Sequence, residues 1–202
     1  AEWSSDGTGL LFEARTGGDR QLFRVAATGG PVIQLTRGQR QLSGISRSDR
    51  GHVMAYVSTN AITPNELFVS RGDGSGERKA TSFHDDLMSR IELAEPERLT
   101  WIVGDSTEIE GWLLAPVGYR AGQSYPMVLK IHGGPHSAYG NTFFPTFHVL
   151  SNAGFFVLYT NPRGSDGYGH DFRYATRGKW GQLDSEDFLQ GVETAMARYP
   201  DI

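Results

Sequence analysis

The 202-residue sequence contains no cysteine. Disulfides, cysteine-ligated zinc, iron–sulfur clusters and thiol nucleophiles are therefore excluded within it. It also lacks any apolar run approaching the 18 or so residues that a membrane-spanning helix requires. Positive charge is not in excess, since 19 lysines and arginines oppose 23 acidic residues and give a formal net charge of −4. Because phosphate neutralisation supplies most of the affinity of non-specific nucleic-acid binders, nucleic acid is a disfavoured partner.

A secretory signal is also missing from the first residues, because Ala1 to Asp6 contain neither a basic start nor an apolar core. We therefore expect a cytoplasmic protein with no membrane partner. Hydrophobic residues make up 38% of the sequence and charged residues 21%. This is an ordinary globular composition, neither disordered nor fibrous.

Residues 1–92 contain short apolar runs separated by Gly, Asp, Ser and Thr, which predict β-strands. The expected strands are Gly9–Ala14, Gln21–Ala26, Pro31–Thr36, His52–Ser58 and Glu66–Ser70. The region also repeats itself: Leu22-Phe23 recurs as Leu67-Phe68, Leu35-Thr36 as Ala80-Thr81, and Ser5-Asp6 as Ser48-Asp49. A period of 43–45 residues is typical of β-propeller blades, with a β-sandwich as the alternative. Two units do not close a propeller, so we expect about two blades of a larger one.

Residues 93–202 alternate strand and helix patterns, which predict an α/β domain with a parallel sheet. A hairpin is expected from Leu99–Val103 and Ile109–Ala115 around Gly104-Asp105, and buried parallel strands from Met127–Ile131 and Phe155–Tyr159. Helices are expected over Thr142–Ala153, ended by Gly154, and over Asp184–Tyr199, capped by Asp184 or Ser185. Two parallel strands are too few for a complete domain, so we expect its N-terminal part only.

The strongest chemical signal is His132-Gly133-Gly134-Pro135, directly after a predicted strand. Glycines there let backbone N–H groups face a reacting oxygen, and such a loop supplies one oxyanion donor in α/β-hydrolases. The alternative is a tight turn in which His132 only packs. The next strand is followed by Asn161 to Gly169, which contains three glycines. No Gly-Lys-Ser/Thr follows and the dinucleotide spacing is absent, so a structured loop near an active site is favoured over a phosphate cradle.

These motifs resemble the prolyl oligopeptidase family of serine peptidases, and its acylaminoacyl-peptidase-like branch in particular. The resemblance is carried by Trp3-Ser4-Ser5-Asp6-Gly7, His132 to His136, Asn161 to Ser165, Gly167-Tyr168-Gly169, Trp180-Gly181 and Asp184 to Asp187. It implies C-terminal blades of a β-propeller over residues 1–92, then the N-terminal part of an α/β-hydrolase domain over residues 93–202. It also implies a Gly-x-Ser-x-Gly nucleophile followed by Asp and His. That motif is absent from the sequence. In the family it follows a helix like Asp184–Tyr199, so we expect all three residues beyond residue 202 and no activity in this chain alone.

The resemblance also implies which groups hold the oxyanion. Some branches carry Tyr at the position of His132 and use its hydroxyl. The acylaminoacyl branch implies a backbone donor instead, the N–H of Gly134 with Gly133 as the fallback, while His132 orients the loop. From their positions after a strand and in the next helix, Arg163 and Asp187 are expected to form an ion pair near the site, with Asp184 or Glu186 as alternative partners.

The remaining candidates have structural interpretations. His84-Asp85-Asp86 is expected to be a solvated acidic turn, and the scattered histidines give no i, i+4 pair, so neither metal nor cofactor is expected. Core packing is expected for Phe143, Phe144, Phe147 and Trp180, with the alternative that one phenylalanine lines a specificity pocket. Glu108 and Glu110 are expected to be strand-surface charges.

Taken together, the sequence predicts part of a peptidase that hydrolyses short or N-acylated peptides by acyl transfer through a Ser-His-Asp triad. Its expected partners are short peptides and the remainder of the same polypeptide, and a homo-oligomer is compatible with the sequence. One alternative is an esterase on the same hydrolase fold, against which the N-terminal repeat counts. The other is a non-catalytic propeller interaction module, against which residues 93–202 count.

Overall fold

The computed structural model describes residues 1–4, 6–48, 50–104 and 106–202. Positions 5, 49 and 105 lie outside the described residues, so the Ser-Asp pairs of the repeat and the Gly104-Asp105 turn are described only in part. The chain forms two compact units: residues 1–91 with 140–143, and residues 92–139 with 144–202. The predicted boundary after residue 92 lies within one residue of the first division. The assignment of residues 140–143 to the first unit was not predicted.

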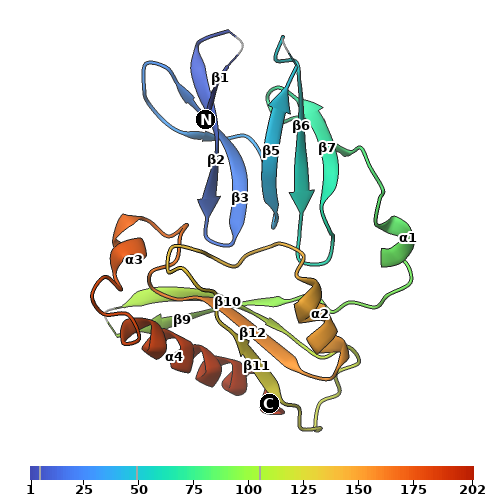
Figure 1. Ribbon diagram of the computed structural model, residues 1–202, viewed down its shortest axis with the longest axis vertical. Helices are drawn as coiled ribbons and strands as arrows, with labels where there is room; N and C mark the ends of the chain where they lie inside the picture. The colour runs from blue at the N-terminus through green and yellow to red at the C-terminus, as the bar shows by residue number, and fades with distance from the viewer. Residues whose placement is uncertain (5, 49, 105) are drawn as a thin grey trace. The chain divides into compact units, whose positions relative to one another are not determined.

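The first unit is a β-sheet made of two antiparallel meanders (Figure 1). The first meander consists of β1 (Glu2–Trp3), β2 (Gly9–Thr16), β3 (Asp19–Ala26) and β4 (Ile33–Gln34). The second consists of β5 (Gln41–Arg47), β6 (Val53–Thr59), β7 (Glu66–Arg71) and β8 (Arg78–Lys79), followed by the short helix α1 (Asp85–Met88). A single parallel register pair, Arg20 with Gln41, joins the meanders.

The sequence repeat is a structural repeat. In the first meander the N–H of Leu22 donates to the hydroxyl of Thr36 at 2.9 Å. The N–H of Leu67 donates to the hydroxyl of Thr81 at the same distance in the second meander, 45 positions later. Each threonine hydroxyl in turn donates to a side chain buried in the strand. The repeated dipeptides therefore mark equivalent hydrogen-bonded positions.

Those two buried acceptors differ between the meanders. Thr36 donates to the amide oxygen of Gln21, whereas Thr81 donates to the carboxylate of Glu66. Glu66 also accepts from the backbone N–H of His84 at 3.0 Å and lies 3.0 Å from the His84 ring nitrogen Nδ1. Burial by itself would raise the pKa of Glu66, but the hydrogen bonds from Thr81 and His84 outweigh it and lower that pKa to about 2.

All five predicted strands of this unit are present, but three others were missed. These are β1, β5 and β8, of which β1 and β8 have two residues each. β5 has the sequence Gln-Leu-Ser-Gly-Ile-Ser-Arg, and its small and polar residues do not give the apolar pattern that predicts a strand. The strand nevertheless buries Leu42 completely. Residues 140–143 join this unit because Asn141 bonds to Gly18 and Asp19, at 2.9 and 2.8 Å.

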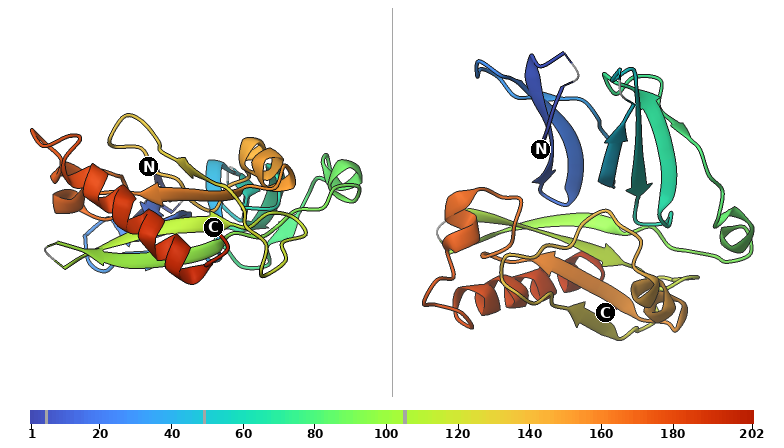
Figure 2. Two further views of the ribbon diagram at one scale, coloured as in Figure 1. Left: turned by 90° about the horizontal axis from the view of Figure 1, so that it is seen from below. Right: turned by 45° about the horizontal axis from the view of Figure 1, so that its top comes forward.

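The second unit is a four-stranded sheet with a helix on each face (Figure 2). Its strand order is β11 (Met127–Lys130), β12 (Phe156–Asn161), β10 (Thr107–Leu114), β9 (Glu97–Val103). β9 and β10 form the predicted antiparallel hairpin, and β11 runs parallel to β12 as predicted. Helix α2 (Pro145–Asn152) connects the two parallel strands, and α3 (His170–Tyr174) and α4 (Leu183–Arg198) follow β12.

The two faces of this sheet have separate apolar cores because side chains alternate along each strand. Phe156 and Leu158 of β12 pack with Ile109, Leu113 and Ala195, and Ala195 belongs to α4. On the other face Val157 and Tyr159 pack with Trp112, Leu114 and, from α2, Phe147. β12, buried along its whole length, is thus a central strand covered on both faces.

Helix α4 is held closely to the sheet by one glycine. A Cβ at Gly191 would lie 2.7 Å from the Trp101 ring, so only glycine lets this ring pack flat on the helix. The Trp101 indole N–H also donates to the carbonyl oxygen of Asp187 at 3.1 Å. The helix begins at Leu183 with Gln182 as its N-cap, so the predicted caps, Asp184 or Ser185, were wrong by two or three positions. The carboxylate of Asp184 instead accepts the N–H of Gly181 at 2.7 Å.

No helix among residues 1–4, 6–48, 50–104 and 106–202 has the length and apolarity needed to cross a membrane.

Candidate active site

Two loops follow the carboxyl ends of the parallel strands β11 and β12. We call residues 132–139 the glycine loop and residues 161–166 the arginine loop. Because the strands are parallel and adjacent, the loops meet at one edge of the sheet, where open α/β sheets bind their ligands. The structure thus places the predicted residues His132, Gly133, Gly134 and Arg163 at the same edge.

The backbone of the glycine loop presents two N–H groups. Gly134 has φ of +63°, a left-handed conformation that favours glycine, and its carbonyl oxygen accepts the N–H of Ser137 at 2.9 Å. Neither the Gly133 N–H nor the Gly134 N–H donates to any residue that the structure describes. Both glycines are exposed, and a Cβ on either would meet no atom within 4 Å. Both donors are therefore available to a ligand.

His132 is fixed by a side chain of the arginine loop. Its Nε2 lies 3.0 Å from the hydroxyl oxygen of Ser165. That hydroxyl donates its only hydrogen to the carbonyl oxygen of Pro162 at 2.7 Å, so Nε2 of His132 carries the proton and donates to Ser165. The ring also contacts Tyr139 edge-on, with centroids 5.2 Å apart. These contacts fix the orientation of the His132 ring, and its role in positioning the glycine loop stays a prediction.

Asn161 joins the two loops at the end of β12. It is completely buried, its Oδ1 accepts the Tyr139 N–H at 2.7 Å, and its Nδ2 donates to the Tyr139 carbonyl oxygen at 3.0 Å. Nδ2 also donates to the hydroxyl of Tyr168 at 2.7 Å. One amide side chain thus satisfies both backbone groups of Tyr139 and closes the glycine loop.

Two further hydrogen bonds connect the same loops. The N–H of Asp166 donates to the carbonyl oxygen of Ser137 at 3.0 Å, and Nδ1 of His136 lies 3.2 Å from the carbonyl oxygen of Gly164. Since a carbonyl oxygen only accepts, Nδ1 of His136 is the donor. The glycine loop is thus bonded along its length to the arginine loop. Such support keeps donor groups in place before a substrate arrives.

Glu110 does not lie on the strand surface, as the sequence predicted, but is buried at 5% exposure. Its carboxylate accepts hydrogen bonds from Arg98 and from the hydroxyl of Tyr168. Burial, together with the charge of Glu110, raises the pKa of Tyr168. The prediction failed for Glu110 because these partners come from β9 and from the segment after β12. Glu108 is exposed, as expected.

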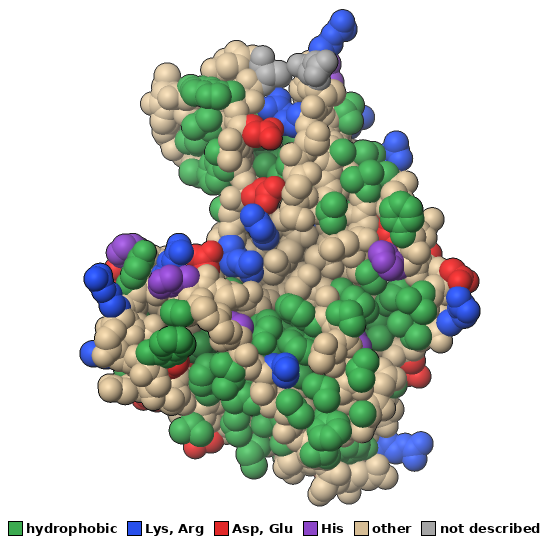
Figure 3. All heavy atoms as spheres, viewed as in Figure 1, with side chains coloured by type: hydrophobic (Ala, Val, Ile, Leu, Met, Phe, Trp, Pro, Cys, Tyr) green, Lys and Arg blue, Asp and Glu red, His purple; other side chains and the backbone are tan. Residues whose placement is uncertain are grey.

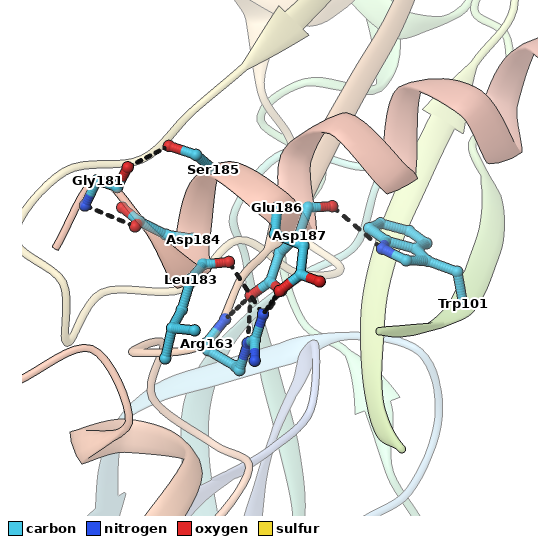
Figure 4. Close-up of polar contacts among 8 residues, drawn as sticks. All are labelled: Trp101, Arg163, Gly181, Leu183, Asp184, Ser185, Glu186 and Asp187. Carbon is cyan, nitrogen blue, oxygen red and sulfur yellow. Dashed lines mark hydrogen bonds and ion pairs between the residues drawn. The ribbon is translucent and has the colours of Figure 1, made fainter. Parts of the chain in front are cut away.

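The predicted ion pair between Arg163 and Asp187 is present and buried (Figure 4). Arg163 is 5% exposed and Asp187 is fully buried. The guanidinium donates to the carboxylate through Nη2 at 2.7 Å and through Nε at 3.0 Å. The backbone N–H of Arg163 also donates to the same carboxylate, at 2.7 Å. Burial raises the pKa of Asp187, and the bonds from Arg163 oppose that shift.

The same guanidinium also reaches the start of helix α4. Nη2 of Arg163 donates to the carbonyl oxygen of Leu183 at 3.1 Å and to the carboxylate of Glu186 at 2.7 Å (Figure 4). Glu186, predicted as an alternative partner to Asp187, is therefore an additional one, and its side chain is half exposed. Arg163 joins the arginine loop to the first turn of α4, which in turn holds Trp101 of the sheet.

A cavity of about 240 Å³ adjoins the two free N–H groups. It is lined by Ile131, His132, Gly133, Gly134, Pro135, Pro162, Arg163, Thr176, Trp180, Asp184 and Phe188. Trp180 is 69% exposed, so its prediction as a core residue was wrong. Of the predicted core phenylalanines, Phe147 is buried and Phe144 packs beside it, whereas Phe143 is half-buried in the first unit. None of the three lines this cavity.

Sequence reasoning missed the residues that support the glycine loop. Asn161 and Ser165 are both completely buried, although they lie in a polar, glycine-rich segment that predicts an exposed loop. His84-Asp85-Asp86 was also predicted to be a solvated turn; Asp85 and Asp86 are exposed and begin the short helix α1, while His84 contacts Glu66. Within the described part of the chain, no three His, Cys, Asp or Glu side chains are grouped as a metal site would require.

Residues 141–201 match the prolyl oligopeptidase family. The chain is similar to the uncharacterized peptidase YuxL of Bacillus subtilis (strain 168), with 34% identity over 201 residues, covering 99% of the chain and 30% of that protein. It is also similar to dipeptidyl-peptidase 5 of Trichophyton equinum, with 26% identity over 197 residues, covering 94% of the chain and 27% of that protein. The chain thus spans less than a third of the length of these relatives.

Solved structures of acylaminoacyl peptidases share the fold. The enzyme of Pyrococcus horikoshii superposes with a TM-score of 0.86 and 26% identity, covering 97% of this chain and 30% of its own. An acylaminoacyl peptidase in complex with Z-Gly-Gly-Phe-chloromethyl ketone also superposes with a TM-score of 0.86, at 25% identity over 96% of this chain and 30% of its own.

Proposed function

Because the chain resembles the prolyl oligopeptidase family in sequence and acylaminoacyl peptidases in fold, we propose that the full-length protein is a serine-type peptidase. Its substrates are short or N-acylated peptides. A serine attacks the substrate carbonyl, a histidine moves the proton, and an aspartate orients the histidine. These three residues lie beyond residue 202, because the present sequence has no Gly-x-Ser-x-Gly. The mechanism requires no cofactor.

The observation that carries this proposal is the pair of N–H groups in the glycine loop. They are unpaired among the described residues, exposed beside a cavity, and fixed by Asn161 and Ser165. Donors held in this way stabilise the negative oxygen of a tetrahedral intermediate, and one such donor contributes about 3–4 kcal/mol to the transition state. The Gly134 N–H is the proposed donor, with Gly133 as the fallback, and His132 positions the loop.

The architecture is consistent with this role. We interpret the two meanders as blades of a β-propeller, supported by their shared hydrogen bonds at a spacing of 45 residues. We interpret the strand order β11-β12-β10-β9, with one helical crossover, as the first part of an α/β-hydrolase sheet. A propeller would admit only small substrates. We further propose a cytoplasmic location and the remainder of the polypeptide as the partner of this chain.

The proposal is tested with the full-length protein and with this chain alone. The full-length protein is expected to hydrolyse acyl-amino-acid or peptide p-nitroanilides and to lose activity after reaction with a fluorophosphonate. This chain is expected to show no turnover. Persistent turnover by the purified chain would place the nucleophile within these 202 residues. A full-length protein that neither hydrolyses peptides nor reacts with the fluorophosphonate would refute the peptidase assignment.

A further inference from the structure

A second cavity, of about 310 Å³, lies beside the glycine loop and has a different character. Its walls include His136, Arg173, Tyr174, Arg177 and Trp180, and none of its described lining residues is acidic. Figure 3 shows basic and histidine side chains gathered over α3, where Arg173 and Tyr174 lie. The cavity therefore combines positive charge with aromatic walls.

The two arginines retain hydrogen-bonding capacity. Nη1 of Arg173 contacts the carboxylate of Asp166 at 3.3 Å, and both side chains of this pair are 42% exposed. Nε of Arg173 is buried and has no partner among the described residues. Arg177 is exposed, and its guanidinium makes no ion pair with a described carboxylate. Because the Arg177 side chain is exposed and the Arg173 side chain is 42% exposed, both guanidinium groups have N–H groups left to donate to an acceptor from outside the chain.

The aromatic walls distinguish this cavity from a site for a small inorganic ion. The Tyr174 ring packs between His136 and His170, with centroids 5.1 and 4.6 Å away. Trp180 is 69% exposed and lines both this cavity and the cavity beside Gly134. Such rings provide apolar contact for an organic group, whereas guanidinium groups bind a planar carboxylate through paired N–H groups.

We propose that this cavity is a subsite for a carboxylate of the peptide substrate, held by Arg173 and Arg177. The proposal rests on the proposed peptidase function. Since both cavities share Pro135, Thr176 and Trp180, a peptide whose carbonyl lies at Gly134 reaches the subsite past the Trp180 ring. The carboxylate belongs either to the C-terminus of the peptide or to an acidic side chain, because both present the same group.

The test compares matched substrates on the full-length protein. In the first pair of peptides, one member ends in a free C-terminal carboxylate and the other in a C-terminal amide. In the second pair, one member has a Glu side chain where the other has Gln. A carboxylate is expected to lower KM by about tenfold in one pair, with kcat nearly unchanged. Arg177→Gln and Arg173→Gln are expected to reduce this preference, and the double variant to abolish it. Lys179→Gln is the matched control, because Lys179 is an exposed nearby cation that does not line the cavity.

Binding of the same peptides, followed by tryptophan fluorescence with Trp180→Phe as the reference, separates the two proposals. Carboxylate-dependent binding that is lost in the double arginine variant, without hydrolysis, would retain the subsite and refute the peptidase function. Equal KM and equal binding for both members of each pair would overturn the subsite. A carboxylate preference that survives in the double variant would overturn it as well.

Discussion

The hydroxyl of Ser165 lies 3.0 Å from Nε2 of His132 and donates its own hydrogen to Pro162. One fully buried serine therefore sets the tautomer of a histidine in the neighbouring loop. Because His132 directly precedes Gly133 and Gly134, its orientation bears on where their N–H groups point.

If the full-length protein has the proposed peptidase activity, replacing Ser165 with alanine is expected to lower its kcat with little change in KM. The substitution leaves Nε2 of His132 and the carbonyl oxygen of Pro162 without their partner, which loosens donors that act mainly in the transition state. Ser137→Ala is the control, because the described contacts of Ser137 use only its backbone. Steady-state kinetics and the ring ¹⁵N shifts of His132 provide the measurements. Unchanged kcat with an altered His132 tautomer would contradict the positioning role.

The two glycines of the loop respond differently to a side chain. Gly134 has φ of +63°, a conformation in which an alanine costs about 1–2 kcal/mol. Gly133 does not have a positive φ, and a Cβ added to it would lie in open space. Gly134→Ala is therefore expected to displace its N–H and lower kcat by up to about 10²-fold. Gly133→Ala should retain most of the activity. A change confined to KM, or equal losses in both variants, would assign the oxyanion contact elsewhere.

Asp187→Asn is expected to destabilise the protein by about 3–5 kcal/mol, because the buried Arg163 guanidinium loses its charged partner. Glu186→Gln removes a carboxylate from the same guanidinium, but that side chain is half exposed, so its cost should be below about 1 kcal/mol. Urea midpoints of the transition that involves the second unit compare the two variants. Equal midpoints would mean that the ion pair does not stabilise this edge of the sheet.

Acid sensitivity is expected from Glu66 in the first unit. Its folded pKa is about 2, below the ordinary 4.5, so folding favours the ionised form. The resulting stabilisation is complete above pH 4.5 and is lost as the pH falls through the folded pKa. Glu66→Gln should make unfolding of this unit less dependent on pH between about 4.5 and 2, since Gln21 fills the equivalent position in the first meander.

The control for this experiment is Glu2→Gln, at an exposed position of the same sheet. It should leave the slope of unfolding free energy against pH unchanged. If Glu66→Gln also leaves that slope unchanged, the carboxylate is not selectively stabilised in the folded state. Circular dichroism at successive pH values would confirm that the variant folds with its sheet intact.

Much of this fold could be predicted from the sequence because the signals were local. Apolar runs bounded by glycine and proline marked β11 and β12, and Gly154 ends the helix between them with φ of +89°. The repeated Leu22 and Leu67 marked equivalent strands, because each repeat recreates the same hydrogen bond to a threonine. The ion pair of Arg163 with Asp187 could also be predicted, since both residues lie next to elements whose positions were clear.

What the sequence could not determine was burial that depends on distant neighbours. Glu110 has the sequence environment of a surface charge, but Arg98 and Tyr168 surround it once three separate segments are assembled. Trp180 has a large aromatic side chain of the kind that usually packs in a core. No described element covers it, however, and it lines two cavities.

The sequence by itself thus determined most of the strands, the two longer helices, their order and the two loops at the edge of the sheet, because backbone conformation follows local residue patterns. The tertiary structure decided which polar side chains support those loops. Asn161 closes the glycine loop only because β12 ends beside Tyr139, 22 positions earlier in the chain. A buried amide is stabilised only where donors and acceptors converge on it, and that convergence depends on folding rather than on neighbouring residues.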